Sequence, residues 1–215
     1  MSDAKLHAID AADHAAITTA IRSAEAKTSG EIFAVVAHRS DDYLFVAGFF
    51  AGLWALVGGF ALAYLLPISG IAPSALALVD GQAIAFLSLF ALMMVSRRLR
   101  MLFVPRALAY RRASANAVRQ FLAHGVHATA GRSGVLLFVS IDEHYAEVVA
   151  DSGITGRVPQ HEWNAMVRDL TEGAKAGDLT TGYLRAIDRA GALLAEHFPP
   201  VDGDGNELDD RLIEL

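Results

Sequence analysis

The sequence predicts an α/β protein with a small mixed β-sheet that is interrupted by a two-helix transmembrane hairpin. Residues 43–66 carry no charge and residues 76–96 carry one, and both stretches are long enough to cross a bilayer as helices. Short, apolar, β-branched segments stand on both sides of this hairpin, with helical patterns before and after them. The first of these segments, residues 31–37, cannot be a stable strand alone, so it must pair with strands beyond residue 134. The hairpin is therefore expected to be an insertion into one domain.

The part of the domain before the hairpin is predicted to be one helix and one strand. Residues 12–27 place alanine and isoleucine at the three-to-four-residue spacing of a single helix face. Thr28, Ser29 and Gly30 end this helix. The next seven residues, EIFAVVA at 31–37, are apolar and β-branched, which predicts the first strand.

The membrane hairpin is predicted from two apolar spans and a helix-breaking connection. Residues 43–66 would form a helix of about 36 Å, which crosses a hydrocarbon core of about 30 Å with some tilt. The second span has Asp80 near its start, where the side chain reaches water at the outer interface. Two prolines and a glycine break the chain within residues 67–75. Gly48 and Gly52 form G-x-x-x-G, which permits close contact with the hairpin partner or with a second copy.

Arginine and lysine residues set the expected orientation of the hairpin. The connection 67–75 contains neither, whereas six arginines lie within residues 97–112, directly after the second span. The positive-inside rule places both termini and the α/β domain in the cytoplasm. The same arginine cluster either contacts anionic lipid headgroups or acts only as a stop-transfer flank.

The remainder of the domain follows the hairpin. Helical spacing of apolar residues, a nearly continuous apolar run and the turn residues between them predict, in order, a helix, two strands and two closing helices. These lie at residues 106–128, 135–141, 145–150, 160–175 and 180–197. An acidic tail follows two prolines, and its leucines at 208, 212 and 215 are spaced as an apolar stripe on a terminal helical turn. The expected divisions are 1–42 and 97–198 for the domain, 43–96 for the hairpin and 199–215 for the tail.

Composition excludes several classes of site. The formal net charge of -6 is opposite to that of a general nucleic-acid binder, so no nucleic-acid partner is expected. The chain has no cysteine, which excludes disulfides, thiolate metal sites and cysteine nucleophiles. His161 and Glu162 begin like the H-E-x-x-H zinc motif, but Ala165 stands where the second histidine is needed.

Several segments resemble the TPM-domain family. Residues 28–32, TSGEI, are similar to the start of the family's first strand, and residues 132–140, RSGVLLFVS, are similar to its central strand. Residues 145–154 resemble its next strand and glycine turn, and residues 175–178, KAGD, with Gly182 resemble its late helix signature. The resemblance covers about residues 12–42 and 104–198 and points to the bacterial membrane-bound branch with a hairpin inside the domain. It implies an α/β/α sandwich at the bacterial inner membrane.

The candidate site residues are acidic. Glu31 opens the first strand, Asp142 and Glu143 follow the second, and Asp151 ends the third. Carboxylates gathered at the ends of strands can bind Ca²⁺ or Mg²⁺, although an antiparallel pair of strands would keep Asp142 and Asp151 apart. The alternative is that these acids are solvated turn residues. Arg132 either holds a phosphate or carboxylate or forms a surface ion pair.

The sequence supports two hypotheses for the function. The first is a membrane-anchored interaction module that assists the assembly or maintenance of other membrane proteins, with the lipid bilayer and those proteins as partners. The alternative, which the resemblance implies, is a divalent-cation-dependent phosphatase in which Arg132 stabilises the developing charge. The strong anchor signal and the lack of a complete catalytic motif favour the interaction module.

Overall fold

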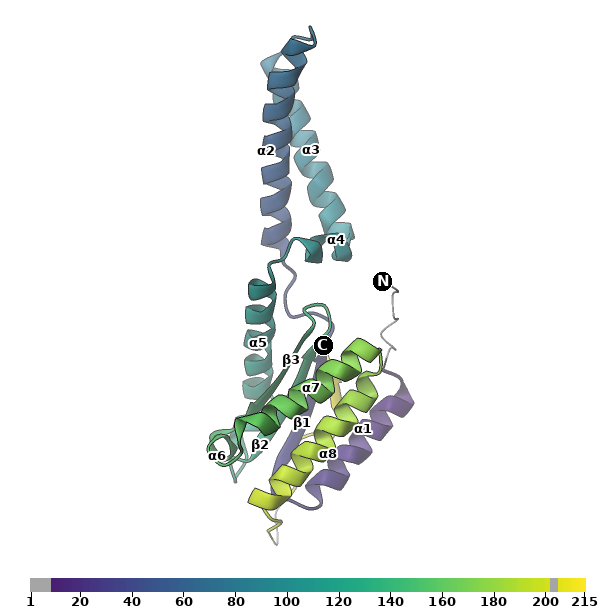
Figure 1. Ribbon diagram of the computed structural model, residues 1–215, viewed down its shortest axis with the longest axis vertical. Coiled ribbons are helices and arrows are strands. Elements are labelled where there is room, and N and C mark those ends of the chain that lie inside the picture. Colours follow the sequence, from purple (N-terminus) through teal and green to yellow (C-terminus); the bar gives the residue numbers. More distant parts are fainter. Residues whose placement is uncertain (1–8, 202–204) are drawn as a thin grey trace. The chain divides into compact units, whose positions relative to one another are not determined.

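The computed structural model describes residues 9–201 and 205–215, and the chain forms two units. The first unit comprises the residues up to 40 and those from 109 onward, and the second comprises residues 41–108. The first unit contains a four-stranded mixed sheet with the order β3-β2-β1-β4 (Figure 1). The strands are β1 (Glu31–Ala37), β2 (Gly134–Ser140), β3 (Tyr145–Ala150) and β4 (Leu212–Glu214). The predicted α/β fold class is confirmed.

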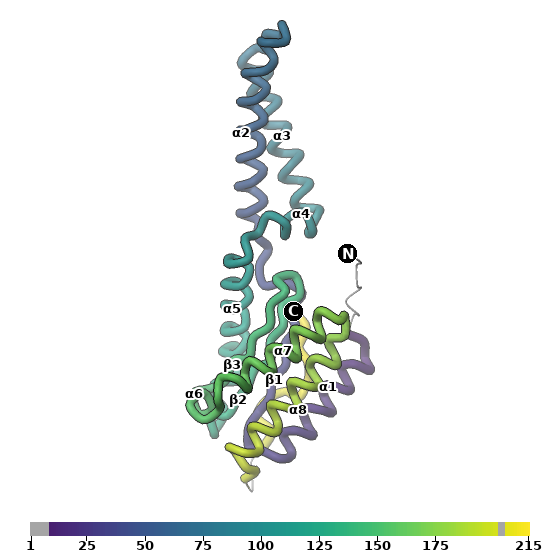
Figure 2. The backbone as a smooth tube through the Cα atoms, in the orientation of Figure 1, coloured from purple at the N-terminus to yellow at the C-terminus, as the bar shows by residue number. Residues whose placement is uncertain are grey.

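The pairing of β1 with β2 makes one domain from segments on both sides of the hairpin. These two strands are parallel over seven residues, from Glu31 opposite Gly134 to Ala37 opposite Ser140. Strand β3 is antiparallel to β2, and β4 is parallel to β1. The expectation that the first strand pairs beyond residue 134 is therefore correct. Figure 2 follows the chain from β1 through the hairpin and back into the domain.

Helices cover both faces of the sheet, as the α/β/α arrangement requires (Figure 1). On one face, Ile32, Ala34 and Val36 of β1 lie in a buried cluster with residues of α1 (Ala11–Glu25), α7 (Gln160–Ala176) and α8 (Leu179–His197). On the other face, Phe33 and Val35 pack with α5 (Arg106–Ala123) and the 3-10 helix η1 (Val126–Ala128). Because both faces are covered, every residue of β1 and β2 is buried, and their apolar residues do not alternate with polar ones.

Helices α7 and α8 approach closely at two glycines. A Cβ atom added to Gly173 would lie 2.6 Å from the Cα atom of Gly182. Between the helices, Gly177 adopts the left-handed conformation with φ 76°, and the Asp178 side chain accepts a hydrogen bond from the Thr181 backbone N–H at 3.0 Å. The residues of the late helix signature, KAGD at 175–178 and Gly182, therefore form the tight connection between α7 and α8 and the point where the two helices approach closely.

The second unit is a helical hairpin. Its helices α2 (Leu44–Ile68) and α3 (Ala75–Val95) are long and apolar enough to cross a membrane, and the short α4 (Arg97–Leu102) follows. Cβ positions on Gly48 and Gly52 would lie 3.9 Å from the Phe90 ring and 4.0 Å from the Phe86 ring, respectively. The sequence left two contacts open for Gly48 and Gly52, one with the hairpin partner and one with a second copy. In the structure, the two glycines of α2 face α3 of their own hairpin.

Two predicted elements differ from the structure. The predicted helix 106–128 ends at Ala123, because Gly125 takes a left-handed φ of 70° before η1 begins. The predicted helical turn in the tail is wrong, since residues 212–214 form β4 instead. The Leu215 backbone N–H donates to the Val36 carbonyl at 3.0 Å, so the outer edge of β1 supplies hydrogen-bond partners that a helical turn would leave unused. Tail residues 202–204 lie outside the described residues.

Candidate functional site

The four predicted carboxylates lie at opposite ends of the sheet. Glu31 and Asp151 are at the end where the parallel strands β1 and β2 begin. Asp142 and Glu143 are at the other end, in the turn that joins β2 to the antiparallel β3. In the described ranges, 9–201 and 205–215, no three His, Asp or Glu side chains are arranged to hold a metal ion. The sheet therefore places two of the four residues at each end and does not gather them in one site.

Asp151 and Arg132 are neighbours around Ser152. Asp151 is 7% exposed, and its Oδ1 atom accepts hydrogen bonds from the Ser152 backbone N–H at 2.5 Å and hydroxyl at 3.1 Å. Its Oδ2 atom is buried without a hydrogen-bond partner. Arg132 donates from Nη1 to the Ser152 hydroxyl at 3.4 Å. Asp151 thereby caps the short helix α6 (Ser152–Thr155), which is a structural role for this carboxylate.

Two motif glycines at this end are required by close backbone packing. A Cβ atom on Gly134 would lie 2.1 Å from the Val126 carbonyl oxygen, and one on Gly153 would lie 2.5 Å from the Arg132 carbonyl oxygen. Real Cβ atoms do not approach oxygen so closely, so any side chain here would push the backbone apart. The glycines of the central strand and of the following turn thus fit the strand ends against η1 and the 131–132 loop.

Glu31 lies in a carboxyl cluster with residues that were not predicted. Its Oε1 atom accepts the Glu207 backbone N–H at 3.2 Å, and its Oε2 atom is buried without a hydrogen-bond partner. Glu25 and Asp210 line the same cavity of about 240 Å³. Burial raises the pKa of Glu31, and it raises the pKa of Glu25 to about 8, where the charges of Glu31 and Asp210 add to the effect.

Sequence reasoning missed Glu25 and Asp210 because each is an ordinary acidic residue of a polar segment. Glu25 ends an amphipathic helix, and Asp210 belongs to the tail. Only the docking of residues 206–215 beside β1 brings the two carboxyl groups together. No spacing in the sequence signals this contact.

At the opposite end, Glu143 is held in a buried polar network. It is 3% exposed, and its carboxylate accepts hydrogen bonds from the Ser140 hydroxyl at 2.6 Å and the Ser40 backbone N–H at 3.0 Å. The Ser40 and Ser140 hydroxyl oxygens are 2.8 Å apart, and Asn116 donates to Ser40 at 3.4 Å. The network ties Ser40, three residues beyond the end of β1, to the β2–β3 turn. Asp142 is beside it, with its backbone N–H donating to the His38 carbonyl at 3.1 Å.

Removing the Ser140 hydroxyl is expected to destabilise the domain. Ser140→Ala leaves one oxygen of the buried Glu143 carboxylate without its 2.6 Å donor, which costs about 1–3 kcal/mol of unfolding free energy. Urea unfolding followed by circular dichroism measures the change. Ser23→Ala, at an exposed position of α1, is the control and should change stability by less than about 0.5 kcal/mol. Equal effects of the two substitutions would contradict a stabilising role for the network.

Comparison with known proteins agrees with the fold. Residues 95–193 match the family model of the TPM domain. The chain is similar to the NMR structure of BA42 protein from the psychrophilic bacterium Bizionia argentinensis, with a TM-score of 0.59 and 19% sequence identity. That similarity covers 96% of this chain and 94% of BA42. No curated protein sequence gives a significant match. The match to the TPM domain thus covers the part of the chain that includes β2, β3 and α7, and the resemblance expected from the sequence is supported over residues 95–193.

Proposed function

We propose that this protein is a membrane-anchored TPM-domain module that assists the assembly or maintenance of other membrane proteins. The observation that carries the proposal is the position of the hairpin, between the first strand of the domain and α5. The connections to the hairpin are short, with six residues between β1 and α2 and three between α4 and α5. A domain tethered at both ends of a hairpin stays at the bilayer surface, where its partners would be other proteins of that membrane.

The surface of the hairpin supports a location in lipid. A core helix of a soluble protein is mostly buried, whereas Phe60 and Tyr64 of α2 are 73% and 75% exposed, and Leu76 of α3 is 71% exposed. The arginines at 97, 98 and 100 follow α3 directly, and the connection between α2 and α3 has no basic residue. We therefore assign the protein to the bacterial inner membrane with both termini and the domain in the cytoplasm.

The arrangement of the acidic residues favours binding over single-site catalysis. A cation-dependent phosphatase needs its carboxylates and its arginine around one phosphoryl group. Here Asp151 and Arg132 are at one end of the sheet, and Asp142 and Glu143 are at the other. We therefore do not extend the proposal to phosphatase activity.

Crosslinking in native membranes tests the proposal. The full chain and a chain limited to residues 41–108 would each carry the same affinity tag, and crosslinked partners would be identified by mass spectrometry. We expect membrane proteins that are captured reproducibly by the full chain and not by the hairpin alone, because the domain supplies the contact surface. The same capture by both chains, or no reproducible partner, would contradict the interaction module.

A further inference from the structure

The C-terminal segment, residues 206–215, closes one edge of the sheet. Its strand β4 pairs with β1 at only three positions, from Ala34 opposite Leu212 to Val36 opposite Glu214. The His38 backbone N–H donates to the Leu215 carbonyl at 2.8 Å, which continues the pairing by one hydrogen bond. Leu212 is 3% exposed and joins the core cluster. Three pairs of residues are a short contact, so polar anchors contribute much of what holds this segment.

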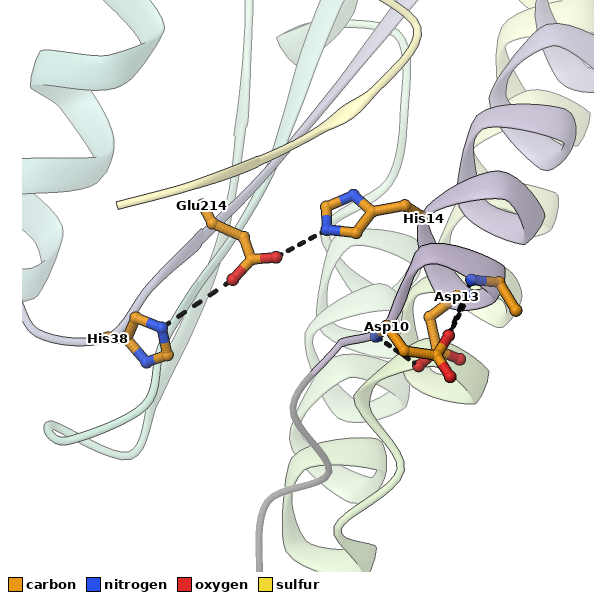
Figure 3. Close-up of polar contacts among 6 residues, drawn as sticks. Asp10, Asp13, His14, His38 and Glu214 are labelled. Atoms are coloured by element: carbon orange, nitrogen blue, oxygen red, sulfur yellow. Dashed lines mark hydrogen bonds and ion pairs between the residues drawn. The ribbon is translucent and has the colours of Figure 1, made fainter.

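Those anchors are charged or carboxylic groups along the whole segment. At its start, Glu31 accepts the Glu207 backbone N–H at 3.2 Å, and Arg22 donates from Nε to Asp210 at 2.8 Å. At its end, the Glu214 carboxylate lies 2.6 Å from His14 and 3.9 Å from His38 (Figure 3). Each anchor therefore includes at least one carboxyl group.

Glu25 and Asp210 line the same cavity, where the segment docks against the end of α1. The Glu25 Oε1 atom accepts the Ile32 backbone N–H at 2.8 Å, and the Asp210 carboxylate accepts hydrogen bonds from Arg22 and Asn206. Two neighbouring carboxyl groups repel each other when both are ionised, and protonating one removes that repulsion. Glu31 lines the same cavity with its Oε2 atom buried and without a hydrogen-bond partner, and Arg22 is the basic residue of the cavity lining. Ionising Glu25 would therefore place three carboxylates beside one guanidinium in a single cavity.

We propose that the Glu25–Asp210 pair is a proton-dependent latch: neutral Glu25 holds the C-terminal segment against β1, and its ionisation releases the segment and opens this edge of the sheet. The groups that face Glu25 are Asp210 of the segment, Glu31 of β1 and Arg22 of its own helix. The opened edge presents the backbone groups of β1 that β4 now covers, and such an edge accepts another extended strand.

The direction of the pH dependence follows from the pKa of Glu25. With the segment docked, burial raises this pKa from an ordinary 4.5 to about 8. With the segment released, Glu25 is hydrated and its pKa returns toward the ordinary value. The docked state therefore binds the extra proton, and docking is fully favoured at low pH and weakens as the pH rises through about 8.

Hydrogen exchange of the full chain in detergent micelles tests the latch. The amides of His38 and Leu215 report docking directly, and their protection would be measured from pH 5.5 to 9 and corrected for the intrinsic exchange rate. In the wild type, we expect protection to fall by about tenfold or more across this range. In Glu25→Gln, whose neutral amide can donate to Asp210 at every pH, the change should be less than about twofold. Glu172→Gln, at an exposed position of α7, is the matched control and should behave as the wild type.

One more variant distinguishes the contribution of His14 from that of the Glu25–Asp210 pair. His14→Gln removes the histidine that lies 2.6 Å from the Glu214 carboxylate and leaves the Glu25–Asp210 pair intact. The latch requires that the fall in protection persists in His14→Gln and disappears in Glu25→Gln. A parallel fall in wild type and Glu25→Gln, a fall abolished only by His14→Gln, or constant protection in the wild type would each overturn the proposal.

Discussion

Replacing residues 44–95 with a short glycine–serine linker is expected to move the protein from the membrane to the soluble fraction and to leave the α/β domain folded. Two helices of 25 and 21 residues anchor a chain almost irreversibly, so their loss should lower the membrane-bound fraction by more than about 100-fold. The domain should stay folded because β1 and β2 pair directly over seven residues. The buried clusters on both faces of the sheet also consist of residues of the first unit. Fractionation of cells followed by circular dichroism of the soluble variant measures both outcomes.

The control for this replacement keeps two apolar helices of the same length and changes only the side chains of α2 and α3. A variant with α2 and α3 replaced by polyleucine–alanine helices of equal length should stay in the membrane after washing at high salt. If the linker variant stayed with the membrane under the same wash, surface contacts of the domain would be the anchor and the hairpin would not. An unfolded linker variant would show that the domain needs the hairpin as a template, contrary to the expectation.

Substituting Gly173 by alanine is expected to destabilise the domain by about 2 kcal/mol, although alanine is the better helix former. The new Cβ atom would lie 2.6 Å from the Gly182 Cα atom and 2.8 Å from the Asp178 carbonyl oxygen. Both contacts are with backbone, so α7 and α8 must move apart, which costs about 3 kcal/mol as overpacking. The higher helix propensity of alanine offsets about 1 kcal/mol of this destabilisation. The melting temperature, followed by near-ultraviolet circular dichroism, should fall by about 4–8 °C.

Gly156→Ala is the matched control for Gly173→Ala. Gly156 has a φ of −86°, which alanine adopts freely, and no atom lies within 4 Å of its added Cβ position. The same methyl group should therefore leave the stability unchanged or raise it by up to about 1 kcal/mol, because it reduces the conformational entropy of the unfolded chain. A drop in melting temperature equal to that of Gly173→Ala would mean that the helix crossing is not the cause.

Most of the domain's elements were predictable because their signals are local. The strand at residues 31–37 and the strand predicted at 135–141 are short apolar runs that only a sheet covered on both faces explains, and both are observed within one residue. The helix predicted at 106–128 was too long, since periodicity cannot detect the left-handed turn at Gly125. The strand β4 was missed because three residues carry no periodic pattern and the surrounding segment is acidic.

The candidate site was predictable only in part. The sequence placed Glu31, Asp142, Glu143 and Asp151 at the ends of strands, and the structure has them there. Which of them meet depended on strand direction: β3 runs antiparallel to β2, and this separates Asp151 from Asp142. Arg132 and Asp151 meet at Ser152 because the loop before β2 and the turn after β3 lie at the same end of the sheet.

The sequence by itself determined the apolar hairpin, the types of the longer strands and helices and the insertion of the hairpin into one domain, because each depends on side chains a few residues apart. The tertiary structure alone decided which charged groups share a site. Arg22 and Asp210, which form an ion pair, are 188 residues apart, and Glu25 joins them only when the last residues dock beside β1. The pKa of Glu25 is therefore a property of the folded chain, since desolvation and the neighbouring carboxylates that raise it exist only after that docking.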